Sequence, residues 1–103
     1  MVSIKDIDNQ INGFLLAVNN GGITISKSYL FGSMAKGNPH QYSDIDIALW
    51  SENFTDNYFE NIARLAPFKR NFPLIEMHPF LQSETKNNNP FIEEIEQTGI
   101  KLI

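Results

Sequence analysis

Residues 30–50 read LFGSMAKGNPHQYSDIDIALW, in which ten residues separate a Gly-Ser pair from an Asp-Ile-Asp triplet. The last seven residues, DIDIALW, have the apolar and aromatic content of a β-strand. Because successive side chains of a strand point to opposite faces, Asp44 and Asp46 are expected on one face, with Ile45 and Ile47 facing the core. The stretch therefore predicts a loop that ends at a pair of carboxylates.

The two aspartates predict a site for a divalent metal. Their positions along the strand differ by about 7 Å, so both carboxylates can reach one or two Mg²⁺ ions. Magnesium prefers hard oxygen ligands and often shares its shell with substrate phosphates. The alternative is the solvated face of an ordinary strand. We favour the metal site because carboxylates are disfavoured in strands, and a broken local rule beside a loop is typical of function.

The Gly-Ser pair predicts a turn that binds phosphate. Gly32 permits a positive φ or a close backbone approach, and Ser33 adds a hydroxyl and a backbone N–H. Lys36 supplies a charge that can neutralise phosphate, and Gly37 again leaves the backbone free. The alternative is an ordinary turn between strands. The combination of the Gly-Ser pair with the Asp-Ile-Asp triplet favours phosphate binding over that alternative.

A third carboxylate is expected if two metal ions assist transfer of a phosphoryl-linked group. Glu76 is the candidate, because it stands between Ile75 and Met77 in an apolar segment where a glutamate does not favour stability. An exposed edge strand is the alternative. His78 is expected on the same face as Glu76 and is interpreted as a surface histidine, with contact to substrate as the alternative. His40 is also interpreted as a surface residue.

Apolar periodicity and turn residues predict seven elements along the chain. Helices are expected over 4–19, 56–66 and 90–98, and strands over 23–31, 44–50, 72–80 and 100–103. Pro67 is expected to end the second helix. This order predicts an α/β (α+β) fold, a small mixed β-sheet flanked by helices.

Each helix is expected to turn an apolar side to the core. The expected inward residues are Ile4, Ile7, Ile11, Phe14, Leu15 and Val18 in the first helix, Phe59, Ile62, Ala63, Leu65 and Ala66 in the second, and Phe91, Ile92 and Ile95 in the third. The aromatic residues exceed what a small core obviously needs. Most are interpreted as core, and some as part of an interface.

Composition narrows the class of protein. The 103 residues predict a single domain over 1–103. The chain has no cysteine, which excludes disulfides and thiolate metal sites and fits a cytoplasmic location. A net charge of −4 argues against a nucleic-acid substrate. The polar N-terminus does not resemble a secretory signal, and no apolar run is long enough to span a membrane.

With these residues assembled, the chain resembles the minimal nucleotidyltransferases of the DNA polymerase β-like superfamily. Their signature is Gly-Ser, ten residues, then Asp-x-Asp, and residues 32–46 reproduce it without a gap. The apolar segment 29–31 matches the strand that leads into the turn, and Ser43 matches the residue often found before the first aspartate. The resemblance implies a nucleotidyltransferase fold.

The resemblance also implies the roles of the site residues. Gly32 and Ser33 would bind the β- and γ-phosphates of ATP, and Asp44, Asp46 and Glu76 would hold the catalytic metal ions, taken as Mg²⁺. The family often has aspartate at the third acidic position. Nucleotide binding would extend to Lys36, Gly37 and Ser43.

The turn departs from the family at Lys36, where small members often carry an arginine. Lysine keeps the charge but loses the planar fork that grips phosphate at two points. The family therefore implies ATP-dependent chemistry here, with a weaker grip on the triphosphate at this position.

The acceptor of the nucleotide is suggested only by the resemblance. Small members are often paired with a helical HEPN-type toxin and act as its antitoxin, attaching AMP to a tyrosine of the toxin. Two alternatives stay open: a non-catalytic antitoxin that neutralises its partner by binding, and a nucleotidyltransferase acting on a small molecule such as an antibiotic. In that last case, a homo-oligomer would build the acceptor site between subunits.

Overall fold

The computed structural model describes residues 4–32, 35 and 44–103. Helices and strands follow one another in the predicted order α-β-β-α-β-α-β. The elements are α1 (Ile4–Asn20), β1 (Ile25–Phe31), β2 (Ile45–Ser51), α2 (Tyr58–Lys69), β3 (Ile75–Leu81), α3 (Pro90–Thr98) and β4 (Ile100–Lys101). No helix of the described chain is both long enough and apolar enough to cross a membrane.

The strands form one mixed sheet in the order β3-β2-β1-β4. β1 pairs antiparallel with β2 and with β4, whereas β2 and β3 run parallel. Helix α2 connects the two parallel strands, as parallel pairing requires a crossover. The prediction of a small mixed sheet flanked by helices is confirmed.

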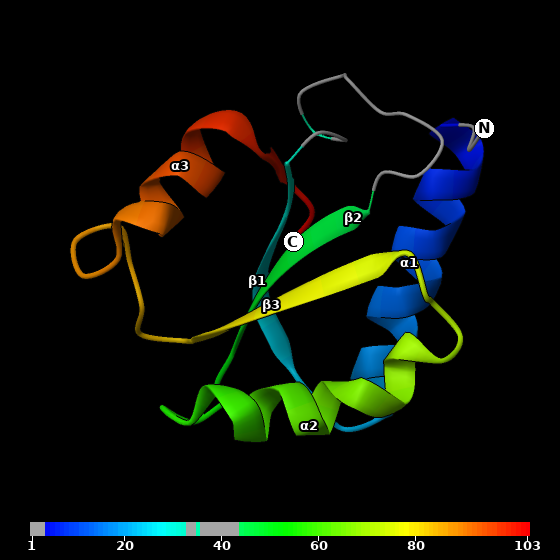
Figure 1. Ribbon diagram of the computed structural model, residues 1–103, viewed down its shortest axis with the longest axis horizontal. Coiled ribbons are helices and arrows are strands. Elements are labelled where there is room, and N and C mark those ends of the chain that lie inside the picture. Colours follow the sequence, from blue (N-terminus) through cyan, green and yellow to red (C-terminus); the bar gives the residue numbers. More distant parts are fainter. Residues whose placement is uncertain (1–3, 33–34, 36–43) are drawn as a thin grey trace.

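Helices cover both faces of the sheet. Figure 1 shows α1 and α2 on one side of the strands and α3 on the other. The alternation of β2 supplies both cores: Ile45, Ile47 and Leu49 belong to the larger apolar cluster, which includes residues of α1 and α2. Ala48 and Trp50 face the opposite way and join the cluster beneath α3. The inward orientation expected for Ile45 and Ile47 is confirmed, since both are fully buried.

The α1 helix follows its apolar period closely. Ile7, Ile11, Phe14 and Val18 are buried, and Leu15 is partly buried against the same cluster. The Ile4 side chain lies outside what the structure describes. The helix ends at Asn20, and Gly22 then takes a φ of +91°, which is the left-handed conformation expected of a helix stop.

The α2 helix corrects two predictions. Pro67 lies inside the helix, which continues to Lys69. A proline in the last turn removes a single intrahelical donor, so the helix can continue through it for two residues. The expected inner side is also wrong in part: Leu65 is buried, but Phe59, Ala63 and Ala66 are exposed.

Asn61 takes the buried place on α2 that its apolar neighbours were expected to fill. Its side chain accepts a hydrogen bond from the Thr55 N–H at 2.9 Å and donates to the Thr55 carbonyl oxygen at 2.8 Å. Burial of this amide is tolerated because both of its polar atoms are paired. Asn57 caps the helix by accepting a hydrogen bond from the Glu60 N–H.

The β3 strand begins at Ile75, three residues later than predicted, because a turn occupies the residues before it. Pro79 lies within this strand, which forms one edge of the sheet. Ile75 directs its N–H to the Phe72 carbonyl and its own carbonyl to the Lys69 ammonium, not to β2. Backbone groups alternate along a strand, so the imide nitrogen of Pro79 also faces the outer edge, where its missing donor costs no ladder bond.

The α3 helix has the predicted bounds and a defined start. The Asn89 side chain accepts from the Phe91 N–H, and Pro90 occupies the first turn. Ile92 and Ile95 are buried as expected, but Phe91 is 42% exposed, so its inward assignment is wrong in part. β4 ends at Lys101, two residues earlier than predicted.

Candidate functional site

The candidate site lies where β1 ends and β2 begins, on the face of the sheet that α3 partly covers. Phe31, the last residue of β1, is the antiparallel partner of Asp46 on β2. Gly32 follows Phe31 directly, and Asp44 immediately precedes β2. Four predicted site residues lie outside the described part of the chain: Ser33, Lys36, Gly37 and Ser43.

Two structural features require glycine at position 32. Its φ is +76°, in the region that side chains disfavour. A Cβ at this position would also overlap the Oδ2 atom of Asp46. The prediction of a positive φ at Gly32 is confirmed. The Asp46 carboxylate approaches Gly32 closely because the antiparallel pairing of β1 and β2 brings the two residues together.

Asp46 is held on its other oxygen as well. Its Oδ1 lies 3.2 Å from the His78 Nε2, and the two side chains are each about 30% exposed. The His78 ring is itself packed edge-on against Phe31, with ring centroids 4.8 Å apart. The Asp46 carboxylate is therefore held in position, because Gly32 lies against its Oδ2 and the His78 imidazole contacts its Oδ1.

The role of His78 was not foreseen. The sequence placed it on the Glu76 face, but as a surface histidine, whereas it is half-buried and bonded to Asp46. The two-residue spacing from Glu76 was the available signal. Its partner lies 32 residues away, and the parallel register of β2 and β3 brings the two side chains together.

Glu76 has the backbone position expected of the third carboxylate. It is the direct partner of Asp46 across the parallel ladder, so both side chains leave the same face of the sheet. Its side chain is half exposed and lies 3.4 Å from the Lys69 ammonium. An exposed ion pair of this kind stabilises the fold by little. Glu76 is thus paired with Lys69, while Asp46 is paired with His78.

The carboxylates of Asp44 and Asp46 are suitable ligands for a hard divalent cation. Asp44 is exposed, and Asp46 keeps part of its carboxylate open to solvent. Within the described residues, no three His, Asp or Glu side chains stand close enough to hold one metal ion. Asp44 and Asp46 are the residues that would hold such a cation, as carboxylate oxygens are the ligands that magnesium prefers. Glu76 would join them by leaving Lys69.

A hollow of about 190 Å³ opens beside Gly32, between the end of β1 and α3. Phe31 and Phe91 form its apolar side, with Thr98 and Glu94 at the helix. The two phenyl rings meet edge-on, with centroids 5.5 Å apart. This hollow leaves room for a ligand between Gly32 and α3.

Comparison with known proteins identifies relatives of the chain. A family model described as Polymerase beta, Nucleotidyltransferase matches residues 16–103. A crystal structure of a toxin–antitoxin with AMP-PNP is 24% identical, and a mutant of the toxin–antitoxin MntA–HpeT is 21% identical, each with a TM-score of 0.59. The matches cover 92% and 89% of this chain and 71% of each of those chains. A search of the curated proteins gave no match.

Proposed function

The chain belongs to the Polymerase beta, Nucleotidyltransferase family, and we propose that it transfers AMP from ATP to a hydroxyl group of a partner protein. One observation carries the proposal: the carboxylate of Asp46 packs on Gly32 and stands opposite Glu76. A triphosphate bound at the Gly-Ser pair would therefore lie beside the carboxylates that bind its metal ions.

We assign phosphate binding to the Gly-Ser pair and the loop after it. The residues are Gly32, Ser33, Lys36, Gly37 and Ser43. The positive φ of Gly32 supports this assignment, because it turns the chain at the end of β1 without a side chain in the way. Metal binding is assigned to Asp44, Asp46 and Glu76, and a divalent cation held there would neutralise the charge of the phosphates.

The proposed step is an in-line displacement at the α-phosphorus of ATP. The acceptor hydroxyl oxygen forms a bond to this phosphorus, and the bond to the oxygen that bridges the α- and β-phosphates breaks. Pyrophosphate leaves, and the hydroxyl proton passes to solvent. The chain contributes positioning and fixed charge, and the double restraint on Asp46 by Gly32 and His78 serves both.

We propose that the acceptor is a toxin of the helical HEPN type and that this chain is its antitoxin. Two solved structures that share the fold are toxin–antitoxin proteins, one of them with AMP-PNP. AMP-PNP is an ATP analogue, which agrees with ATP as the nucleotide donor. The partner to test first is the protein encoded by the gene beside that of this chain.

Incubation of the two proteins with Mg²⁺ and ATP labelled at the α-phosphate tests the proposal. Label is expected on the partner with the wild-type chain and not with Asp46→Asn. Asp8→Asn is the matched control, because Asp8 is an exposed aspartate on α1 outside the site. Transfer by Asp46→Asn at the wild-type rate would contradict the site assignment. A stable complex without label would indicate a non-catalytic binding antitoxin.

A further inference from the structure

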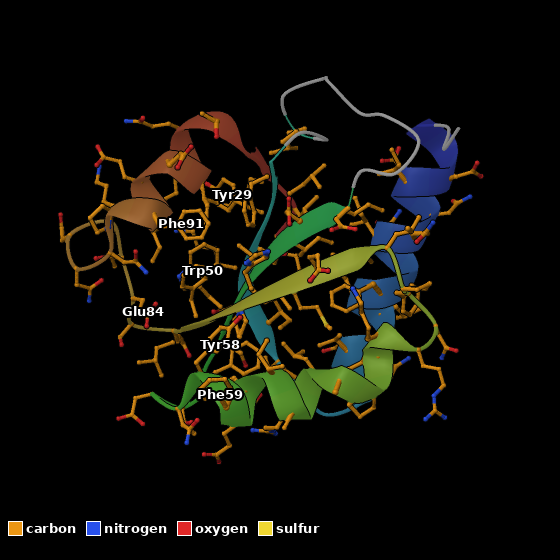
Figure 2. The ribbon with its side chains drawn as sticks, viewed as in Figure 1. Tyr29, Trp50, Tyr58, Phe59, Glu84 and Phe91 are labelled. Carbon is orange, nitrogen blue, oxygen red and sulfur yellow. The ribbon has the colours of Figure 1, made fainter. Side chains whose placement is uncertain are left out.

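Aromatic side chains gather on the surface around the outer edge of β3. Phe59 is 82% exposed, Tyr58 is 53% exposed and Phe91 is 42% exposed. Figure 2 shows Tyr58 and Phe59 on α2 and Phe91 on α3, on opposite sides of β3. We define the aromatic surface as Tyr58, Phe59, Ile62, Met77 and Phe91. Exposed aromatics clustered in this way are typical of a protein interface.

Two open hollows of about 360 Å³ each shape this surface, and Tyr58 lines both. One lies over α2 and β3 and includes Phe59 and Met77. The other includes Phe91 and His78. Small-molecule sites are usually enclosed, whereas these hollows are open and share a central tyrosine. Their form suits a partner that inserts two neighbouring side chains.

The aromatic surface is continuous with the candidate active site. The His78 ring lines the second hollow, and its Nε2 contacts the Asp46 carboxylate at 3.2 Å. A side chain seated in that hollow is therefore separated from Asp46 by a single imidazole ring. A protein bound here would therefore lie next to the residues that we assign to AMP transfer.

The edge of β3 is closed to strand addition. Pro79 offers no N–H on its outer side, and the Ile75 carbonyl already accepts a hydrogen bond from the Lys69 ammonium at 2.7 Å. A continuous ladder with another strand cannot form along this edge. Recognition at this surface therefore depends on side chains, as when a helix lies in a groove.

Charge indicates what kind of partner fits. Glu84 lines the hollow that contains His78, and Asp56 lines a smaller hollow beside it. Within the described residues, neither carboxylate has an ion-pair partner, whereas Lys69 is engaged by Glu76. A second copy of the chain would present the same unpaired carboxylates in a symmetric interface and would not neutralise them. A partner with lysine or arginine around its apolar side chains would be attracted.

We propose that the aromatic surface is the docking site for the acceptor protein, which contacts it with apolar side chains flanked by basic residues. This inference rests on the proposed function, because it places the acceptor next to the site of AMP transfer. Phe59 is the expected anchor, since it is the most exposed of the large apolar residues in the described chain.

The test is calorimetric binding, without nucleotide, to the protein encoded by the neighbouring gene. Phe59→Ser is expected to weaken the Kd by about tenfold or more, as expected for loss of an interface anchor. Leu16→Ser is the matched control, because Leu16 is 60% exposed on α1 and lines neither hollow. Glu84→Lys is a second variant that should also weaken binding. The hydrogen bond that the Trp50 indole N–H donates to the backbone carbonyl of residue 84 would remain in this variant.

The outcomes separate this inference from the proposed function. Weakened binding by Phe59→Ser, with no AMP transfer by the wild-type chain, would support the docking site and contradict the transferase. AMP transfer with undiminished binding by Phe59→Ser and Glu84→Lys would overturn the docking site alone. No binding by the wild-type chain, or a dimer of this chain that Phe59→Ser dissociates, would overturn it as well.

Discussion

Replacing Gly32 by alanine separates the cost of backbone strain from the cost to the site. The residue has a φ of +76°, and its added Cβ would overlap the Asp46 Oδ2. Gly22 provides a matched control, because its φ is +91° and nothing lies within 4 Å of a Cβ built there. The two alanine variants therefore share the strain of a left-handed backbone, and only Gly32→Ala displaces the carboxylate.

The strain can be estimated for both variants. A left-handed conformation costs a residue with a Cβ about 1–2 kcal/mol. In a domain of this size, such a loss lowers Tm by about 4–16 °C. Gly32→Ala adds the overlap with Asp46, which can be relieved only by moving the carboxylate or the turn. Misplacement of a catalytic group by about 1 Å can lower a rate about a hundredfold.

Thermal unfolding followed by circular dichroism, together with AMP transfer measured below the transition, would test this reasoning. Both variants should show a similar fall in Tm, while only Gly32→Ala should lose about a hundredfold or more in rate. A Gly32→Ala variant that transfers AMP at the Gly22→Ala rate would refute the claim that Gly32 makes room for Asp46. If both variants lose the same share of the AMP-transfer rate, the loss in Gly32→Ala comes from lower stability and not from displacement of Asp46.

Three further outcomes are expected. His78→Ala should lower the rate of AMP transfer by about ten- to a hundredfold with little change in Tm, because it releases one Asp46 oxygen. Partial recovery of the rate by His78→Gln would support a positioning role for His78. An unchanged rate in His78→Ala would exclude that role. Asn61→Ala should lower the free energy of unfolding by about 1–3 kcal/mol in urea titrations, since it leaves the Thr55 N–H and carbonyl without their partner. A loss below about 0.5 kcal/mol, which is the usual range for surface substitutions, would contradict that account. Removal of divalent metal with EDTA should abolish transfer, and excess Mg²⁺ should restore it; transfer that persists in EDTA would contradict the metal assignment.

Much of the fold follows from local sequence patterns. The period of α1 and the alternation of β2 each pointed to one buried face, and both faces are buried as expected. The start of α3 was also predictable, because Pro90 marks its first turn. The motif itself placed Gly32 before the aspartates, although the contact between Gly32 and Asp46 depends on the return of the chain along β2.

The errors have physical causes that local patterns do not contain. Phe59 was assigned to the same side of α2 as Leu65, but six residues separate them, which places their side chains about 120° apart around the helix. The buried side follows Asn61 and Leu65, and Phe59 is exposed. Asn61 is buried because Thr55 pairs with its amide, which a hydrophobic pattern cannot indicate. The bond between His78 and Asp46 depends on the parallel register of β2 and β3, which the sequence does not specify.

The central claim is that this chain moves AMP from ATP onto a partner protein. Intact-mass spectrometry of the neighbouring gene's product, after incubation with the chain, Mg²⁺ and ATP, tests it most directly. We predict a mass increase of one or more AMP units, which disappears when Asp44 and Asp46 are both replaced by asparagine. An unchanged partner mass in a complex that forms equally well with the double variant would contradict the claim.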